Sequence, residues 1–158
     1  MTLEPDTPIL DRLKLFFEEV NWPFTQMKDP RLLQLVYMGE KASWTCFARA
    51  REEHSQFIFY SVCPLSAPQP LRHEVAEFIT RINYGLMLGC FEMDFEGGDV
   101  RCKTGISVEG AELTKSLIKS VVFANVLIME RYLQGFTAVM SGYLTPTEAL
   151  ADIESQSS

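Results

Sequence analysis

The sequence predicts an α+β protein in which helices pack on a twisted antiparallel β-sheet. Apolar residues recur at helical spacing near both ends of the chain and in its middle, whereas the short alternating runs between them are typical of strands. Helices and strands do not alternate strictly, as a parallel doubly wound sheet requires. The 158 residues suffice for one core, so we expect a single domain over 1–153 and a disordered tail over 154–158.

The first predicted element is an amphipathic helix. Thr7 is a suitable N-cap, and Pro8 suits the first helical position. The apolar residues that follow share one helical face: Ile9, Leu10, Leu13, Phe16, Phe17 and Val20. This face predicts a helix that packs against the rest of the core.

A β-rich stretch follows, with an apolar run over 32–38 and a predicted hairpin formed by 43–51 and 56–63. If the hairpin turns at its charged centre, Phe47 lies beside Tyr60 on one face, and small alanines oppose phenylalanines on the other. Both faces of the sheet therefore carry apolar groups.

A second hairpin turns at Gly97-Gly98, a pair typical of turns that need positive φ. Apolar residues alternate with acidic ones before this turn and with mainly basic ones after it. A two-residue turn places Asp94 opposite Arg101 and Glu92 opposite Lys103, as ion pairs on a solvated face. We therefore interpret these acids as structural, rather than as a metal or acid–base cluster.

Four further helical segments are predicted, one of them a short helix over 136–143. One spans about 70–84 and is capped by Gly85; a long one spans about 111–134 and stops at Gly135. The stretch Thr145-Pro146-Thr147-Glu148 has the pattern of a capping box, which starts a last short helix.

The middle of the long helix, 121–133, is apolar nearly all round. A helix on one side of a sheet needs only an apolar stripe, so this segment must bury a second side against other helices or another subunit. Asn125 lies at the edge of the segment or bonds a neighbouring backbone group. Together with the second apolar sheet face, the segment defines a possible interaction surface: Val122, Phe123, Val126, Leu127, Phe47 and Tyr60.

Charge and hydropathy exclude some classes of partner. The chain has 14 Lys and Arg against 21 Asp and Glu, a net charge of −7, and its cations form no basic stripe, so we expect no nucleic-acid partner. No apolar run reaches the roughly 20 residues that cross a bilayer, and acids stand where a signal peptide has cations. We therefore expect a cytoplasmic protein without a membrane partner. Its four cysteines, none in a C-x-x-C pair, are expected to be buried thiols.

No pattern predicts an enzyme. The two histidines, His54 and His73, have no metal-ligand spacing, and the glycines form no nucleotide-binding motif. We therefore expect no catalytic residue, no metal site and no cofactor. A cavity between sheet and helices, lined by Asn83, Tyr84, His73 or Cys63, would instead indicate a ligand-binding protein or an enzyme.

Several short motifs resemble the YbjN family, over roughly residues 9–140: Arg81-Ile82-Asn83-Tyr84-Gly85-Leu86, Gly89-Cys90-Phe91-Glu92-Met93-Asp94 and Val100-Arg101-Cys102-Lys103-Thr104. The resemblance implies a fold like that of type III secretion chaperones, which are small acidic proteins, usually homodimeric, that bind extended segments of partner proteins. Members of the YbjN family are described as regulators without established catalytic residues. The resemblance therefore implies no active site.

These observations lead to one hypothesis and two alternatives. The hypothesis is a non-enzymatic protein-binding domain, a chaperone-like or regulatory adaptor that acts as a homodimer with an unknown protein partner. One alternative is a small-ligand-binding protein or enzyme with a cavity between sheet and helices. The other is a structural subunit of a larger assembly.

Overall fold

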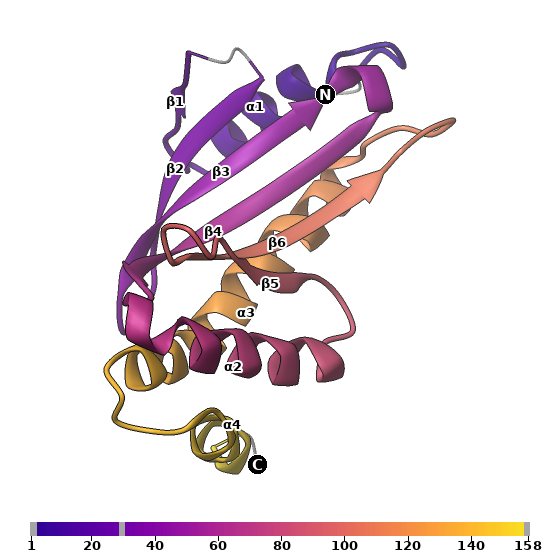
Figure 1. Ribbon diagram of the computed structural model, residues 1–158. Helices are drawn as coiled ribbons and strands as arrows, with labels where there is room; N and C mark the ends of the chain where they lie inside the picture. Colours follow the sequence, from indigo (N-terminus) through magenta and orange to yellow (C-terminus); the bar gives the residue numbers. More distant parts are fainter. Residues whose placement is uncertain (1–2, 29–30, 157–158) are drawn as a thin grey trace.

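A six-stranded sheet forms one layer of the molecule, and α2 (Arg72–Gly85) and α4 (Pro146–Ser155) lie beyond its end (Figure 1). The computed structural model describes residues 3–28 and 31–156. Within them six strands form one antiparallel sheet in the order β1-β2-β3-β4-β6-β5. Their bounds are Thr25–Gln26 (β1), Leu32–Met38 (β2), Ser43–Arg51 (β3), Gln56–Ser66 (β4), Cys90–Met93 (β5) and Asp99–Ser107 (β6).

The α-helices are Ile9–Glu19 (α1), Arg72–Gly85 (α2), Lys115–Met140 (α3) and Pro146–Ser155 (α4). Helices α1 and α3 pack against one face of the sheet, while α2 and α4 pack on the C-terminal half of α3 (Figure 1). This confirms the predicted α+β class. None of the helices in the described ranges is both long and apolar enough to cross a bilayer.

The chain end differs from the predicted tail. The capping box at Thr145 and Glu148 forms as predicted and starts α4. Helix α4 then continues to Ser155, past the predicted start of the tail at residue 154. Residues 157–158 of that tail lie outside the described residues.

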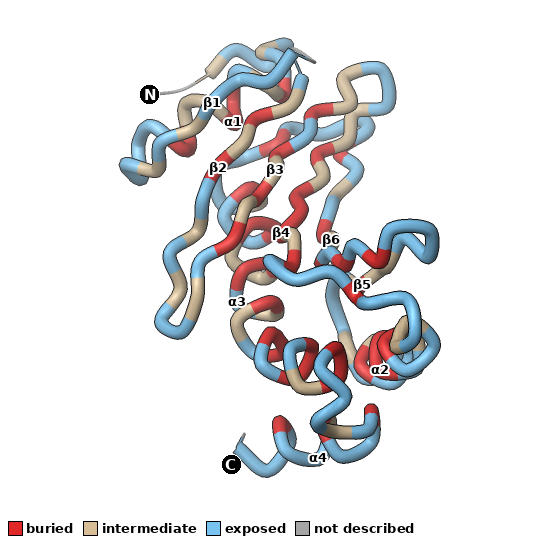
Figure 2. Tube along the Cα trace, turned by 60° about the vertical axis from the view of Figure 1, so that its left-hand side comes forward, coloured by how far each residue is buried: buried red, intermediate tan, exposed pale blue. Residues whose placement is uncertain are grey.

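Burial alternates along the strands, because successive side chains point to opposite faces (Figure 2). The buried face of the sheet and the inner faces of the helices form one core. Phe17 of α1 lies 6.4 Å from Phe59 of β4, and Phe91 of β5 lies 4.8 Å from Phe136 of α3, measured between ring centroids. Burial of these apolar faces is the main force that holds helices and sheet together.

The N-terminus of α1 is capped from a distant turn rather than by Thr7. Helix α1 begins at Ile9, with Pro8 at the N-cap position and no side chain of its own as cap. Instead, the carboxylate of Glu52, in the β3–β4 turn, accepts bonds of 2.9 Å from both the Ile9 and the Leu10 backbone N–H. The predicted cap was wrong because an acid brought in by the sheet satisfies these donors.

The β3–β4 register is confirmed, with Phe47 opposite Tyr60 and Ala48 opposite Phe59. A short 3-10 turn makes the connection, and Ser55 adopts a left-handed conformation there (φ 53°).

The β5–β6 register was predicted wrongly, because the turn is longer than two residues. Glu92 lies opposite Arg101, and Asp94 leaves the ladder. Residues 94–98 form a loop in which Gly98 has φ 81° and accepts a 2.8 Å bond from the Ala67 N–H. Ala67 belongs to the connector between β4 and α2, and its bond to Gly98 holds the loop in this wider form. Gly97-Gly98 therefore does not form a two-residue turn.

Helix α3 passes through Gly135, which was predicted to stop it. A Cβ at this position would lie 2.6 Å from Phe78 Cζ of α2 and 2.7 Å from Ile153 Cδ1 of α4. Gly135 therefore allows three helices to approach closely. The helix ends instead at Met140, and Gly142 follows with φ 75°.

We expect Gly135→Ala to lower the free energy of unfolding by about 1–2 kcal/mol. Overpacking a core costs roughly 1–3 kcal/mol, which outweighs the gain of about 1 kcal/mol in helix propensity. The matched control is Gly85→Ala at the end of α2, where a Cβ would meet nothing within 4 Å. Urea unfolding of both variants checks this, and equal stability of the two would contradict the proposed close packing.

Candidate protein-binding surfaces

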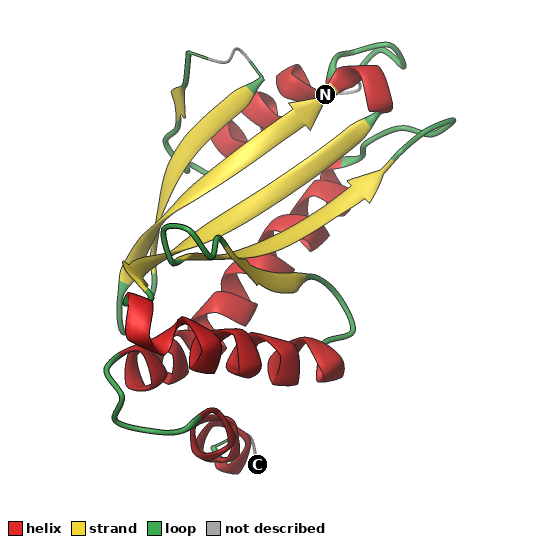
Figure 3. Cartoon of the chain, viewed as in Figure 1, coloured by secondary structure: helices red, strands yellow, loops and turns green. Residues whose placement is uncertain are grey.

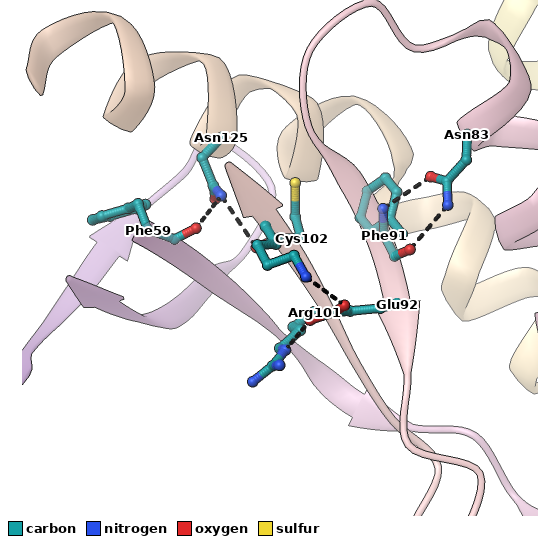
Figure 4. A network of polar contacts seen from close by, with 8 residues as sticks. Phe59, Asn83, Phe91, Glu92, Arg101, Cys102 and Asn125 are labelled. Atoms are coloured by element: carbon teal, nitrogen blue, oxygen red, sulfur yellow. Dashed lines mark hydrogen bonds and ion pairs between the residues drawn. The ribbon is translucent and has the colours of Figure 1, made fainter. Parts of the chain in front are cut away.

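Asn125 fixes which side of α3 faces the sheet. The residue is wholly buried, and its amide nitrogen donates to the carbonyl oxygens of Phe59 (2.9 Å) in β4 and Cys102 (3.1 Å) in β6 (Figure 4). Since these carbonyls belong to neighbouring strands, the amide ties the middle of the helix to the sheet. Of the two positions considered for Asn125, the edge of the segment is wrong, and the bond to backbone groups is found.

This anchor corrects part of the predicted interaction surface. Val122 and Val126 lie in the core and not on the surface, because they share the sheet-facing half of α3 with Asn125. Phe123 is half-buried, and Leu127 is 61% exposed on the outer side. The orientation of this helix could not be predicted from its residues, since an asparagine in an apolar segment can lie in the core or at its boundary.

The opposite face of the sheet carries no helix within the described chain (Figure 3). Its centre is apolar: Phe47 of β3 and Ile58 and Val62 of β4 are half-buried, and Tyr60 is nearly buried among them. We call this surface, with the charged side chains around it, the open sheet face. It holds Phe47 and Tyr60, the two strand residues predicted for an interaction surface.

A charged cluster lies on this centre. The Arg101 guanidinium carbon sits 4.3 Å from the Tyr60 ring centroid. Glu92 accepts bonds from Arg101 Nε (2.5 Å) and Lys103 Nζ (3.0 Å), so one carboxylate bridges two cations (Figure 4). Burial alone would raise the pKa of Glu92, but the bonds from Lys103 and Arg101 outweigh burial and lower it. The bond to Glu92 in turn raises the pKa of Lys103.

The two ends of the open sheet face differ in charge. At one end, Arg49, Arg51 and Lys103 line an open hollow of about 670 Å³. At the other end, a hollow of about 680 Å³ has Asp94 and Asp99 in its lining. The face thus combines an apolar centre with a basic end and an acidic end.

A second exposed apolar surface lies beside β5, and sequence reasoning missed most of it. Tyr84, near the end of α2, is 96% exposed, and in the α2–β5 connection Met87 is 92% and Leu88 64% exposed. The connection ends against α3, since a Cβ at Gly89 would lie 3.7 Å from Ile128 Cδ1. We call Tyr84, Met87, Leu88 and Leu127 the apolar strip. The signal for it in the sequence is the apolar run Leu86-Met87-Leu88 directly after the predicted helix cap.

Asn83 closes the outer edge of β5. Its side-chain amide accepts from the Phe91 N–H (2.9 Å) and donates to the Phe91 carbonyl (3.0 Å), as a neighbouring strand would (Figure 4). An exposed strand edge invites pairing with other chains, and here a side chain occupies that pairing position.

The four residues considered for an internal cavity do not converge. Asn83 is engaged with β5, and Tyr84 points to solvent. His73 is exposed, whereas Cys63 is buried in the core. They therefore form no common site.

The three buried thiols are poorly suited to nucleophilic chemistry. Cys46, Cys63 and Cys102 are buried, as predicted, and Cys90 is partly exposed; all four are free. Burial raises the pKa of Cys46 and of Cys63 to about 11 and also raises that of Cys102, which disfavours the reactive thiolate. Among the described residues, no three His, Cys, Asp or Glu side chains are placed to hold a metal ion.

Comparison with known proteins shows the family. The family model of YbjN, described as a "putative bacterial sensory transduction regulator", matches residues 10–138. The chain belongs to the YbjN family. None of the curated proteins matches the sequence of this YbjN-family chain.

Solved structures share the fold of this YbjN-family chain. YbjN from E. coli superposes with a TM-score of 0.58 at 12% identity, covering 87% of this chain and 93% of that one. A chain of the ExsC-ExsE complex superposes with a TM-score of 0.53 at 9% identity, covering 81% of this chain and 96% of that one. A chain of the HopA1-SchA chaperone-effector complex superposes with a TM-score of 0.48 at 15% identity, covering 77% of this chain and 88% of that one. The first two superpositions show that the fold is the one that the resemblance implied.

We expect Glu92→Gln to lower the free energy of unfolding by up to about 1 kcal/mol near neutral pH, because it removes one partner of two ion pairs. The folded state lowers the Glu92 pKa, so this contribution is present above the unfolded value of 4.5 and is lost as the pH falls through the folded pKa. The difference between wild type and variant should therefore shrink below pH 4.5.

Glu96→Gln, in the exposed loop that follows β5, serves as the control and should change stability little at any pH. Thermal unfolding followed across the acid range measures both variants. A Glu92→Gln difference that grows toward low pH would contradict the assigned charge state.

Proposed function

We propose that this YbjN-family protein is a non-enzymatic, cytoplasmic protein-binding adaptor, chaperone-like or regulatory, that acts as a homodimer. The observation that carries the proposal is that the open sheet face and the apolar strip leave apolar side chains in contact with water, although the core is complete without them. Exposed apolar patches of this kind mark sites of protein interaction. The fold shared with a chain crystallised in the ExsC-ExsE complex supports the same class of function.

The open sheet face suits an extended protein segment. Its centre offers Phe47, Ile58 and Val62 at half burial, and these side chains would lose their remaining water contact under a partner. The surrounding charges of both signs would fix the orientation of that partner. An apolar core within a polar rim is the usual anatomy of a protein interface.

The apolar strip suits a second copy of the chain. A two-fold contact places the same patch on both subunits, so uncharged side chains meet without like-charge repulsion. We take the exposed side chains of Tyr84, Met87, Leu88 and Leu127 as this patch, and Tyr and Met are enriched in interface cores. Because the strip and the open sheet face use different residues, a dimer through the strip leaves the sheet available.

We expect the protein to be a dimer at micromolar concentrations, and Met87→Glu combined with Leu127→Asp to make it monomeric without unfolding it. Each subunit of the variant carries two new charges, so a symmetric dimer would bury four of them. Each unpaired buried charge costs several kcal/mol. Light scattering gives the mass, and circular dichroism reports the fold.

Met38→Glu is the matched control, since Met38 is 77% exposed at the far end of β2 and should tolerate the charge. Val122→Asp should unfold the subunit, because that side chain is wholly buried. A wild-type monomer at these concentrations would overturn the homodimer, and a dimeric Met87→Glu/Leu127→Asp variant would overturn its assignment to the strip.

A further inference from the structure

The basic end of the open sheet face opposes the charge of the whole molecule. The chain carries 21 acids against 14 cations, yet the three charged residues that line the hollow are all cations. Arg49 and Arg51 project from β3, and Lys103 from β6. A local concentration of one sign of charge attracts ligands of the opposite sign even on a protein of like net charge.

The charges of this hollow are only partly compensated. Arg51 Nη1 donates to Gln56 Oε1 (2.8 Å), a neutral partner that orients the guanidinium without cancelling its charge. Lys103 and Arg101 share the single carboxylate of Glu92. Positive charge therefore remains available to a ligand.

The floor of the hollow is apolar and recessed. Ile58 and Tyr60 line it, and Gly105 stands opposite Ile58 in the ladder, where the missing side chain deepens the surface. Strand β5 pairs with β6 only up to Lys103. Beyond that point, residues 104–107 of β6 have no strand neighbour on their outer side among the described residues.

We propose that this hollow binds an acidic, extended segment of a partner protein. Alternate side chains of an extended peptide point the same way about 7 Å apart, and Arg49 and Arg51 are likewise alternate residues of one strand. Two acids spaced by one residue in the partner would each meet a guanidinium, and an apolar side chain beside them would cover Ile58 and Tyr60.

The chemistry favours carboxylates of a peptide over phosphates of a nucleic acid. Three cations in one hollow form no track along a backbone, and the net charge of −7 repels a polyanion that extends beyond it. The inference rests on the proposed protein-binding function and adds the chemistry of the partner segment.

The test uses fluorescence anisotropy with two labelled synthetic peptides. One alternates Glu with Ser around a central Leu, and the other has Gln in place of every Glu. We expect only the acidic peptide to bind, and the paired change Arg49→Gln/Arg51→Gln to weaken it at least about tenfold, equivalent to 1.4 kcal/mol. The control pair Lys14→Gln/Lys119→Gln makes the same change in net charge on the helical side and should leave binding unchanged.

Each other outcome overturns the inference in a recognisable way. Equal binding of the Gln peptide would mean that charge does not select the partner, which leaves a protein-binding function intact. Equal loss in both variant pairs would mean that only the net charge matters. Tighter binding of a single-stranded oligonucleotide, sensitive to Arg49→Gln/Arg51→Gln, would assign the hollow to nucleic acid. If the acidic peptide does not bind and light scattering still shows a wild-type dimer, this inference alone is overturned. If light scattering shows a monomer, the proposed homodimer is overturned.

Discussion

The side-chain amide of Asn125 is the contact on which the arrangement of surfaces depends. Its nitrogen lies within hydrogen-bonding distance of Phe59 O, Cys102 O and the Thr104 hydroxyl, so it joins α3 to two neighbouring strands inside the core. A buried amide that lost these partners would leave polar groups unsatisfied, which costs about 1–3 kcal/mol. Residues 121–133 of α3 are apolar on nearly every side, so hydrophobic burial alone would allow several rotations of the helix about its axis. The bonds of Asn125 favour one of them. The fixed orientation buries Val122 and Val126 and leaves Leu127 outside.

With both sheet-packing helices on one side, the other side of the sheet must be stable in water by its own side chains. Tyr60 is covered by Arg101, whose guanidinium is held in turn by Glu92. Aliphatic and aromatic surface is thus shielded by charged groups that a partner can displace or reorient. The sheet edges are blunted as well: Asn83 bonds the outer side of β5, and Trp22 Nε1 donates to the Val36 carbonyl of β2 (2.9 Å). Access to the sheet is therefore directed to its open face and to the unpaired end of β6.

The fold class could be predicted from local patterns, because periodicity and turn residues act over a few residues. The β3–β4 register followed from pairing small residues with large ones, and the capping box of α4 is a local motif. The errors arose where distant residues decide the structure. Glu52 caps α1 from another turn, Gly135 accommodates Phe78 and Ile153 rather than ending a helix, and Ala67 and Arg72 hold the loop that shifts the β5–β6 register. The candidate surfaces were predicted only in part, for the same reason. The place of Phe47 and Tyr60 on one sheet face follows from strand alternation, whereas the exposure of Met87 depends on how the chain passes from α2 to β5.

The physical character of the two surfaces assigns them different roles. The apolar strip has no charge to specify a unique partner, but it is matched by an identical strip, so symmetry alone supplies its complement. The open sheet face has a basic and an acidic end, and a charged surface gains specificity by rejecting partners whose charges are misplaced. Association through the strip therefore requires only a second copy, whereas recognition at the sheet requires a particular sequence. In the proposed binding mode, the selective step lies at Arg49 and Arg51, where two neighbouring guanidinium groups, one of them oriented by Gln56, would meet a chain that must present its acids in matching positions.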